Sequence, residues 1–345
     1  MRAAFLEAPR KLVIREVETP RPKAGEVLIR VGSCGVCGSD IHQYKGAGFG
    51  DRALQAPKIL GHEFGGVVEA AGSKEYEHLV GKKVAVEPAI PCMKCEVCLS
   101  GNQNCCPDAL FPGLPPTHGA YRERLAWPGW LCEPAPDHFT HDQIAALEPL
   151  AVAVHVMDLA KPGLARSAAV FGVGMIGQLI LEAARKSDLA PLIAVDRLPY
   201  RLQMAKAAGA THVVNAADGD PTKQIMEITH GRGAAYTFEA TNVPEGPALA
   251  VAAAAHAGKV FLCGISEETR TIYSGIIARR RGLTVYSVRR SRRTLERAIR
   301  LFEAGAFNLD RTITHGFPLD RIGEAFDLIC DYRDGVVKAM IRIGS

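Results

Sequence analysis

Hydrophobic and polar positions follow two different patterns along this chain, and the change falls near residue 147. Before it, short β-branched runs at 27–31, 66–69 and 83–86 alternate with turns rich in Gly and Pro. After it, short apolar runs alternate with alanine-rich stretches of helical spacing. The first pattern is typical of an irregular, mostly β domain, and the second of βαβ units that build a parallel sheet.

The second region is predicted in more detail. Strands are expected at 168–172, 192–196, 212–215, 235–238, 259–264 and 283–287, with helices such as 175–186 and 201–208 between them. Beyond residue 293 we expect helices at 294–304 and around 322–331, and a last strand at 337–343. The alternation predicts an α/β fold with a doubly wound parallel sheet.

Composition is that of a globular protein of about two domains. The 345 residues are 48% hydrophobic and 23% charged, and a net charge of +4 does not by itself favour a nucleic-acid partner. Glu7 and Pro9 interrupt the N-terminus before an export signal could form, and no run of about 18 apolar residues predicts a membrane span. We therefore expect a cytoplasmic protein without a membrane or nucleic-acid partner.

A glycine-rich turn, Gly-Val-Gly-Met-Ile-Gly at 172–177, follows the first strand of the second region and precedes a helix. Its glycines allow close approach of a pyrophosphate, and the helix N-terminus supplies partial positive charge. The next strand ends at Asp196, whose carboxylate would bind the adenosine ribose and repel a 2′-phosphate. The pattern predicts NAD, although Arg197 and Arg201 could accept a phosphate. The predicted cofactor-binding residues are Gly172, Gly174, Ile176, Gly177, Asp196 and Arg201.

Ten cysteines in a chain without an export signal need an explanation other than disulfides. The spacing Cys92-x2-Cys95-x2-Cys98, followed by Cys105-Cys106, is typical of a closed four-thiolate zinc site. Spacing alone does not decide between the last two as the fourth ligand. An iron–sulfur cluster is disfavoured. The ferredoxin cysteine motif has three residues between its third and fourth cysteines, and the loop that follows Cys98 is longer.

A second set of metal-binding residue types is scattered over Cys37, His62, Glu63 and Glu148. One thiolate, one imidazole and a carboxylate, with the fourth position left to water or substrate, are what a catalytic zinc requires. Taken singly, a histidine or cysteine in such a context is usually part of the core. Only the combination with a nicotinamide site indicates catalysis.

Together these motifs resemble the zinc-dependent medium-chain dehydrogenases over nearly the whole chain. The resemblance includes Cys-Gly-Ser-Asp-x-His at 37–42, Gly-His-Glu at 61–63, the four cysteines and the glycine-rich turn. The sorbitol (polyol) dehydrogenase branch is suggested by Gly-x-Gly-Asp at 48–51 and by Glu-Pro-Leu-Ala-Val-x-Val-His at 148–155.

This resemblance implies a GroES-like catalytic domain at 1–150 with a structural zinc lobe at about 88–110. A Rossmann NAD-binding domain is implied at 151–288, and a C-terminal segment at 289–345 returns to the catalytic domain. Resemblance to the family also implies a homo-oligomer, a dimer or tetramer, for which the apolar sheet edge near 262–287 could supply the contact.

The family's site residues carry over by motif. The structural zinc is implied to bind Cys92, Cys95, Cys98 and Cys106. The catalytic zinc is implied to bind Cys37 and His62, with Glu63 and Glu148 as alternatives for the direct carboxylate ligand. Ser39 and His42 resemble the family's proton relay, Asp40 would orient His62, and Arg289 matches a substrate-binding arginine.

The reaction expected from the resemblance is zinc- and NAD-dependent oxidation of a secondary alcohol, such as a polyol, sugar or sugar acid, to the ketone. Further arginines at 279–281, 290, 292 and 293 are either a solvated face or a sign of an anionic substrate, and His118 stands where an acid is common. A threonine-type amino-alcohol dehydrogenase shares nearly every motif. A zinc-ribbon nucleic-acid protein is disfavoured, since it has no need of Cys37, His62 or the glycine-rich turn.

Overall fold

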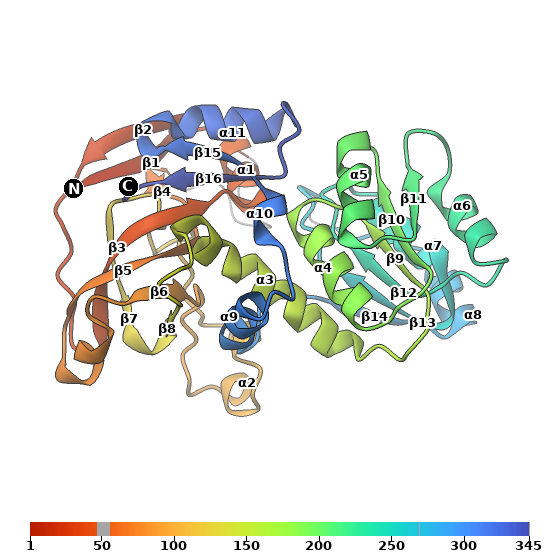
Figure 1. Cartoon of the computed structure of the whole chain (residues 1–345), viewed down its shortest axis with the longest axis horizontal. Helices are drawn as coiled ribbons and strands as arrows, with labels where there is room; N and C mark the ends of the chain where they lie inside the picture. Colours follow the sequence, from red (N-terminus) through yellow and green to blue (C-terminus); the bar gives the residue numbers. More distant parts are fainter. Residues whose placement is uncertain (47–55, 269, 345) are drawn as a thin grey trace. The chain divides into compact units, whose positions relative to one another are not determined.

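The computed structural model describes residues 1–46, 56–268 and 270–344, and the chain divides into two compact units (Figure 1). Unit 1 comprises Met1–Ala151 and Ser291–Ser345, and unit 2 comprises Val152–Arg290. The change of pattern near residue 147 lies inside α3 (His141–Ala160), a helix absent from the sequence-based expectations that contributes residues to both units. The Gly-x-Gly-Asp motif at 48–51 lies outside the described residues.

Unit 2 is built on a parallel sheet with the strand order β11-β10-β9-β12-β13-β14. Its elements are β9 (Ala168–Phe171), α4 (Met175–Lys186), β10 (Leu192–Asp196), α5 (Pro199–Ala208), β11 (His212–Asn215), α6 (Pro221–Ile228), β12 (Ala234–Glu239), α7 (Gly246–Ala253), β13 (Ala254–Leu262), α8 (Gly275–Arg281) and β14 (Thr284–Ser287). Counted along the sequence this is the order 3-2-1-4-5-6 of a doubly wound dinucleotide-binding fold. The predicted fold class is confirmed.

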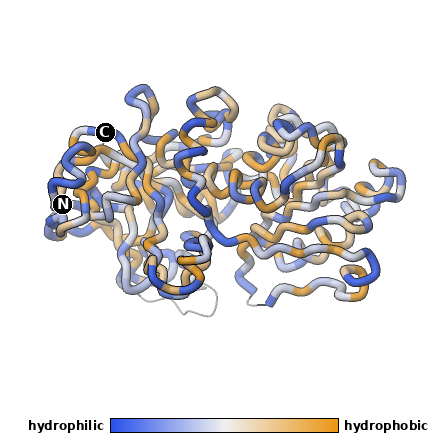
Figure 2. Tube along the Cα trace, turned by 90° about the horizontal axis from the view of Figure 1, so that it is seen from below, coloured by the Kyte–Doolittle hydropathy of each residue, from blue (hydrophilic) through white to orange (hydrophobic). Residues whose placement is uncertain are grey.

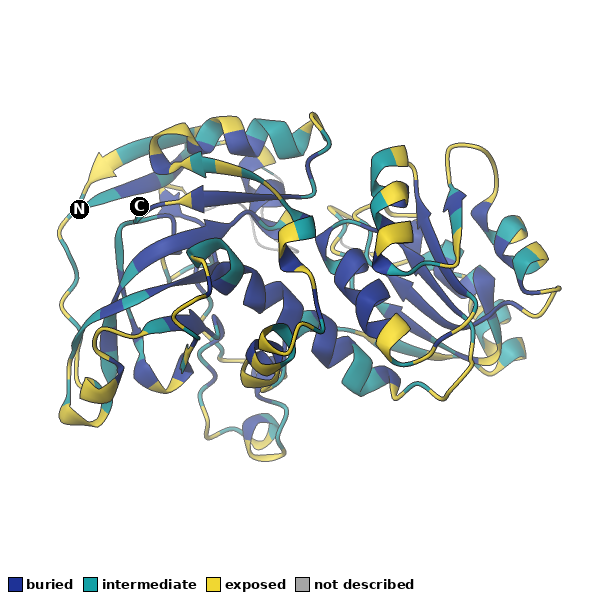
Figure 3. Cartoon of the chain, viewed as in Figure 1, coloured by how far each residue is buried: buried dark blue, intermediate teal, exposed yellow. Residues whose placement is uncertain are grey.

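The strands of unit 2 are apolar because helices cover both faces of a parallel sheet. Every residue of β9, β10 and β12 is buried, as the dark blue strands of Figure 3 show. In Figure 2 the hydrophobic colour is concentrated along inner segments of the trace, and the hydrophilic colour is frequent at the outer turns. One strand differs from expectation: β13 begins at Ala254, ahead of the predicted 259, because Ala254 pairs with Ala234 before a break in register.

Unit 1 is mostly β. Its elements are β1 (Arg2–Ala8), β2 (Lys11–Glu16), β3 (Glu26–Gly35), α1 (Gly38–Lys45), β4 (Lys58–Ile59), β5 (Glu63–Ala71), β6 (Lys83–Val86), α2 (Glu96–Leu99), β7 (Arg124–Pro128), β8 (Cys132–Pro134), the first part of α3, α9 (Leu295–Glu303), α10 (Leu309–Thr312), β15 (Ile313–Pro318), α11 (Ile322–Cys330) and β16 (Lys338–Arg342). A sheet in the order β15-β16-β3-β5-β6-β8, with β7 also paired to β3, carries the core.

The C-terminal segment completes this sheet. β16 pairs antiparallel with β3, Met340 opposite Gly35, so the end of the chain lies beside residues near its start. The N–H of Val36 donates to the carbonyl of Ala339 at 3.0 Å and continues the pairing toward Cys37. Residues more than 300 positions apart in sequence are thereby brought next to the segment that leads into Cys37.

Helix α3 is the one described helix long and apolar enough to cross a membrane by length and composition. Within the protein, however, 72% of its most apolar stretch is buried. Such burial is usual for a core helix, and Figure 3 shows α3 dark over most of its length. Its apolar character is accounted for by packing inside the protein.

Candidate active site and metal centres

Four cysteine sulfurs converge in a small lobe of unit 1. Cys92, Cys95, Cys98 and Cys106 have their sulfurs within 4.8 Å of one another. The base of the lobe is closed by paired backbone hydrogen bonds between Ile90 and Leu110, of 2.9 and 3.0 Å. The structure places Cys106, which is buried, in this cluster, whereas its neighbour Cys105 is exposed and stands outside it.

The lobe fits a zinc ion by its donor set. Four sulfurs about 2.3 Å from one tetrahedral ion would lie about 3.8 Å apart. The measured separations are 4.0 Å for Cys92 to Cys98 and 3.9 Å for Cys95 to Cys106. Backbone N–H groups that donate to the sulfur, from Lys94 and then Cys95, lower the pKa of Cys92 to about 6, which favours the thiolate that a metal needs. These residues would hold the structural zinc.

A mixed donor set forms where β3 and β5 pair. Cys37 follows β3 and caps the N-terminus of α1, while His62 and Glu63 begin β5. Because Gly35 is opposite Glu63 in the ladder, the two segments meet, and a ligand atom of Cys37, His62 and Glu63 each lies within 4.8 Å of the others. Thiolate, imidazole and carboxylate are the donors of a catalytic zinc with an open position. Cys37, His62 and Glu63 therefore fit a catalytic zinc ion.

Asp40 contacts the segments that carry Cys37 and His62. It is fully buried and accepts hydrogen bonds from the N–H of Cys37 and of Gly61, both at 3.2 Å, and from the hydroxyl of Tyr121 at 3.1 Å. Its other contact is with His62, whose Nδ1 lies 3.6 Å from Asp40 Oδ1. Burial opposes the charge, but His62 and the N–H donors hold the pKa of Asp40 below its usual value. The position of Asp40 is compatible with an orienting role toward the imidazole, and that role stays a prediction.

Glu148 reaches the same neighbourhood from α3 and is 8% exposed. It lies outside the tight donor cluster of Cys37, His62 and Glu63. Burial and then the negative charge of Glu63 raise the pKa of Glu148 to about 8. The two glutamates are therefore electrostatically linked, and their ranking as metal ligands stays a prediction.

Sequence reasoning missed two members of this neighbourhood, Lys338 and Tyr121. Lys338 begins β16 and is 3% exposed, and its Nζ donates to Glu63 Oε2 at 2.6 Å. Burial would lower its pKa, but the charges of Glu63, Cys37 and Glu148 raise it instead. Neither residue carries a sequence signal of its own, because each reaches the site only through strand pairing or long-range packing.

The predicted proton-relay residues lie on α1. Ser39 is 7% exposed and His42 5% exposed, on the helix that begins beside Cys37. A buried relay is what a proton leaving a desolvated site would need. The relay itself stays a prediction.

The glycine-rich turn of unit 2 lies at the end of β9, next to the neighbouring strand β12 where the strand order reverses. Gly172 has φ +78°, and a Cβ there would lie 2.7 Å from Thr241 Cγ2. A Cβ on Gly177 would lie 2.0 Å from the carbonyl oxygen of Gly172. Gly174 and Ile176 complete the turn at the start of α4. The topology places the turn where dinucleotide-binding folds bind the pyrophosphate.

Asp196 ends β10 beside this turn. Its two oxygens accept the N–H groups of Val173 at 2.9 Å and Leu198 at 3.0 Å, so the carboxylate is held in a fixed orientation. The guanidinium of Arg201 lies 3.9 Å from it and 3.5 Å from the position of a Cβ on Gly174. Arg201 is thus placed at the phosphate-binding turn, as a cofactor-binding residue would be.

The other predicted pocket residues have mixed outcomes. Arg289 is exposed and belongs to unit 2, and its substrate role stays a prediction. Within the arginine-rich stretch, Arg281 donates to two backbone carbonyls and Arg292 to Asn102 of the zinc lobe at 2.8 Å. His118 accepts the N–H of Ile59 at 3.2 Å. These three side chains have structural contacts.

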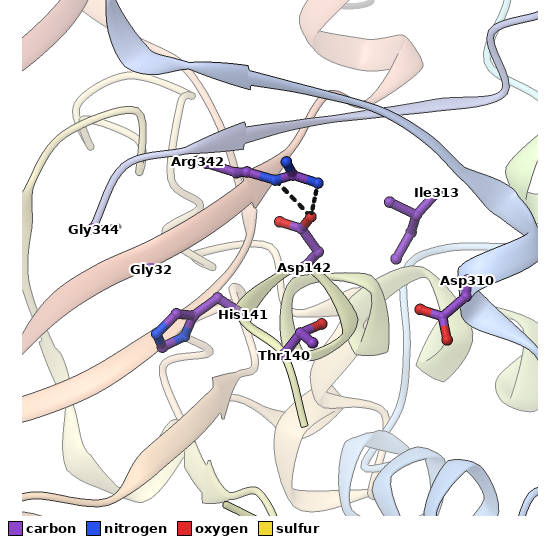
Figure 4. Close-up of a pocket in the computed structure, with 8 residues that line it drawn as sticks. All are labelled: Gly32, Thr140, His141, Asp142, Asp310, Ile313, Arg342 and Gly344. Carbon is purple, nitrogen blue, oxygen red and sulfur yellow. Dashed lines mark hydrogen bonds and ion pairs between the residues drawn. The ribbon is translucent and has the colours of Figure 1, made fainter. Parts of the chain in front are cut away.

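Unit 1 also contains a cavity of about 450 Å³ at the start of α3. Figure 4 shows Arg342 and Asp142 facing one another, with N–O contacts of 2.9 Å. Asp142 also accepts the hydroxyl of Ser33, and Asp310 accepts the amide of Gln143. The cavity contains none of the metal-binding donors, and its carboxylates are paired within the protein, so it is not the active site.

Two family models match the chain. Residues 23–137 match the alcohol dehydrogenase GroES-like domain, and residues 175–304 match the zinc-binding dehydrogenase model. Among curated relatives, a sorbitol dehydrogenase of Bacillus subtilis is 29% identical over 99% of this chain and 97% of its own length. An L-arabinitol 4-dehydrogenase of Hypocrea jecorina is 34% identical over 93% and 86% respectively. An L-threonine 3-dehydrogenase of Bacillus subtilis is 31% identical over 92% and 91%.

Solved structures agree in fold. An alcohol dehydrogenase of Escherichia coli CFT073, solved with NADH, is 27% identical with a TM-score of 0.91, covering 99% of each chain. A putative zinc-binding dehydrogenase of Sinorhizobium meliloti 1021, bound to NADP, is 27% identical with a TM-score of 0.90, covering 99% of this chain and 98% of that one. The family, fold class and zinc requirement expected from the sequence are confirmed.

Proposed function

The chain belongs to the zinc-dependent medium-chain alcohol dehydrogenase family, and we propose that it oxidises a secondary alcohol of the polyol, sugar or sugar-acid class to the ketone, with NAD as hydride acceptor. The observation that carries the proposal is the convergence of Cys37, His62 and Glu63 in unit 1, in a chain whose unit 2 has the dinucleotide turn. Relatives named for sorbitol and L-arabinitol support the substrate class.

The protein's own residues have separate tasks in this proposal. Cys37 and His62 hold the metal together with Glu63 or Glu148, and a zinc ion bound there supplies the Lewis acidity that makes a hydroxyl group acidic. Asp40 holds the imidazole ring of His62 in its orientation. The proton leaves through Ser39 and then His42, which lie in sequence on α1.

Cofactor choice follows from unit 2. The carboxylate of Asp196 would accept the ribose hydroxyls, and the turn at 172–177 would hold the pyrophosphate on backbone N–H groups. The fixed carboxylate at Asp196 disfavours a 2′-phosphate. NAD is therefore proposed over NADP.

A homo-oligomer, a dimer or a tetramer, is also part of the proposal. β14 is an edge strand, with β13 as its described neighbour in the sheet. Ile272 and Ile276, which precede β14, are 71% and 62% exposed. Unpaired strand edges beside exposed apolar residues are commonly covered by a second copy. Light scattering of the purified chain would give the number of subunits.

The test combines NAD reduction across polyols, sugar acids, sugar phosphates and L-threonine with zinc analysis. Cys37→Ala should abolish turnover while NADH still binds, and the matched control Cys105→Ala should keep both, because Cys105 is exposed outside either metal cluster. Preference for L-threonine would favour an amino-alcohol dehydrogenase instead. Full activity in Cys37→Ala would refute the proposed site.

A further inference from the structure

A buried lysine faces the catalytic donor set from the C-terminal strand. Lys338 and Glu63 are each 3% exposed. Nζ of Lys338 donates to Glu63 Oε2 at 2.6 Å and to the carbonyl oxygen of Val36 at 2.9 Å. Burying an ammonium group is costly unless it is paired and hydrogen-bonded, and both conditions are met here.

The backbone fixes this contact from two sides. β16 pairs with β3 so that Lys338 begins its strand next to the segment that leads into Cys37. On the other side, a Cβ on Gly35 would lie 2.3 Å from Glu63 Oε2, so the carboxylate oxygen rests against a bare Cα. Oε2 of Glu63 is thereby held between Gly35 and the ammonium group.

The contact between Lys338 and Glu63 also changes the total charge around the metal ion. A divalent ion with the thiolate of Cys37, the carboxylate of Glu63 and the buried carboxylate of Asp40 sums to a formal charge of minus one. His62 as a neutral imidazole leaves this sum unchanged, and Glu148 lies outside the donor cluster and is not counted. The ammonium of Lys338 brings the sum to zero. A negative site would oppose loss of a proton by a bound hydroxyl group, whereas a neutral one opposes it less.

We propose that Lys338 is a positioning residue of the catalytic metal site, which engages one carboxylate oxygen of Glu63 and offsets the excess negative charge around the metal ion. The inference rests on the proposed function, since it assumes that the set binds a metal ion. It predicts that removing the charge strengthens metal binding while weakening turnover. A residue needed only for folding would weaken both.

The central variant is Lys338→Gln, which retains N–H donors for Glu63 and Val36 but lacks the charge. Zinc affinity is measured by competition with a chromophoric chelator, and Cys37→Ala supplies the background of the four-cysteine lobe. We expect the catalytic-site dissociation constant to fall by about tenfold or more, because the attraction between the ion and its ligand set is no longer offset. The rate of NAD reduction should fall in the same variant.

Two further variants separate charge from packing. Combining Lys338→Gln with Glu63→Gln restores the formal charge and should return the affinity toward that of the original chain. The control is Lys83→Gln, because Nζ of Lys83 also bonds within unit 1, to the backbone carbonyls of Asp137 and Phe139 and not to the metal-binding donors that the structure describes. This control should leave metal affinity unchanged.

The outcomes distinguish failure of the Lys338 proposal from failure of the proposed function. An unmodified chain that binds metal only at the lobe would overturn the proposed function and this inference with it. Two bound ions with an unchanged or weaker affinity in Lys338→Gln would overturn the inference alone. If Lys338→Gln does not fold, the double variant decides: it should bind the metal at least about tenfold more tightly than Glu63→Gln alone, and an equal or weaker affinity contradicts the charge argument.

Discussion

Replacing Asp196 by serine should shift the chain from NADH toward NADPH. The carboxylate is 8% exposed and is fixed by the N–H groups of Val173 and Leu198. A serine hydroxyl can still accept one of these hydrogen bonds, but it carries no charge. Arg201 lies 3.9 Å from the carboxylate, and without that negative charge the position favours a 2′-phosphate.

The size of the shift follows from two opposing terms. Two unit charges at about 4 Å repel by about 1 kcal/mol in water and about 4 kcal/mol at an effective dielectric constant of about 20. Asp196 is largely buried, so relief of this repulsion should improve NADPH binding by about fivefold to about a thousandfold. A lost hydrogen bond to a charged acceptor weakens NADH binding by about 1.5–3 kcal/mol, or about tenfold to a hundredfold.

Calorimetric dissociation constants for both reduced cofactors test this without knowledge of the substrate. The ratio of the NADPH to the NADH constant should fall by at least about fiftyfold in Asp196→Ser. Asp218→Ser is the matched control, because Asp218 is an exposed carboxylate of the same unit. A ratio that moves by less than about threefold in a folded Asp196→Ser variant would show that this carboxylate does not select the cofactor.

Two further predictions concern the metal sites. Cys98→Ser should reduce zinc from about two ions per chain to about one and lower the melting temperature, whereas Cys105→Ser should change neither; equal zinc loss in both would contradict the assignment of the fourth sulfur. In the zinc-depleted chain, burial and Glu63 raise the pKa of Glu148 to about 8 from about 4.3 in an unfolded chain. The folded state therefore retains a proton that the unfolded state has lost, so stability should fall as pH rises from about 4.3 to about 8, and Glu148→Gln should flatten that part of the melting profile.

The parts of the molecule that sequence predicts well are local. The turn at 172–177 needs its glycines because Gly172 has a positive φ and Gly177 packs against the carbonyl of Gly172. The spacing of Cys92, Cys95 and Cys98 likewise reflects contacts between near neighbours, since the N–H of each later cysteine donates to the sulfur of the one before it. Both features leave a fixed spacing in the sequence.

Other features depend on burial or on contacts between distant segments, which spacing along the chain does not record. The choice of Cys106 over Cys105 is a matter of burial, because a short helical turn over Gln103–Cys105 leaves Cys106 inside and Cys105 outside. Lys338 lies 275 positions from Glu63 and meets it only after β16 has paired with β3. Spacing along the chain carries no record of such pairings, so Lys338 could not be predicted.

This difference separates the two metal centres physically. The lobe draws all four donors from a stretch of 15 residues between Cys92 and Cys106, and its backbone closes on itself. The mixed donor cluster instead draws on segments at 37 and 62–63, with the ammonium of Lys338 against it. Its donor geometry therefore depends on the whole of unit 1, including the C-terminal strand. Loosening of that strand would disturb the charge and geometry of the catalytic site while leaving the contacts within the lobe intact.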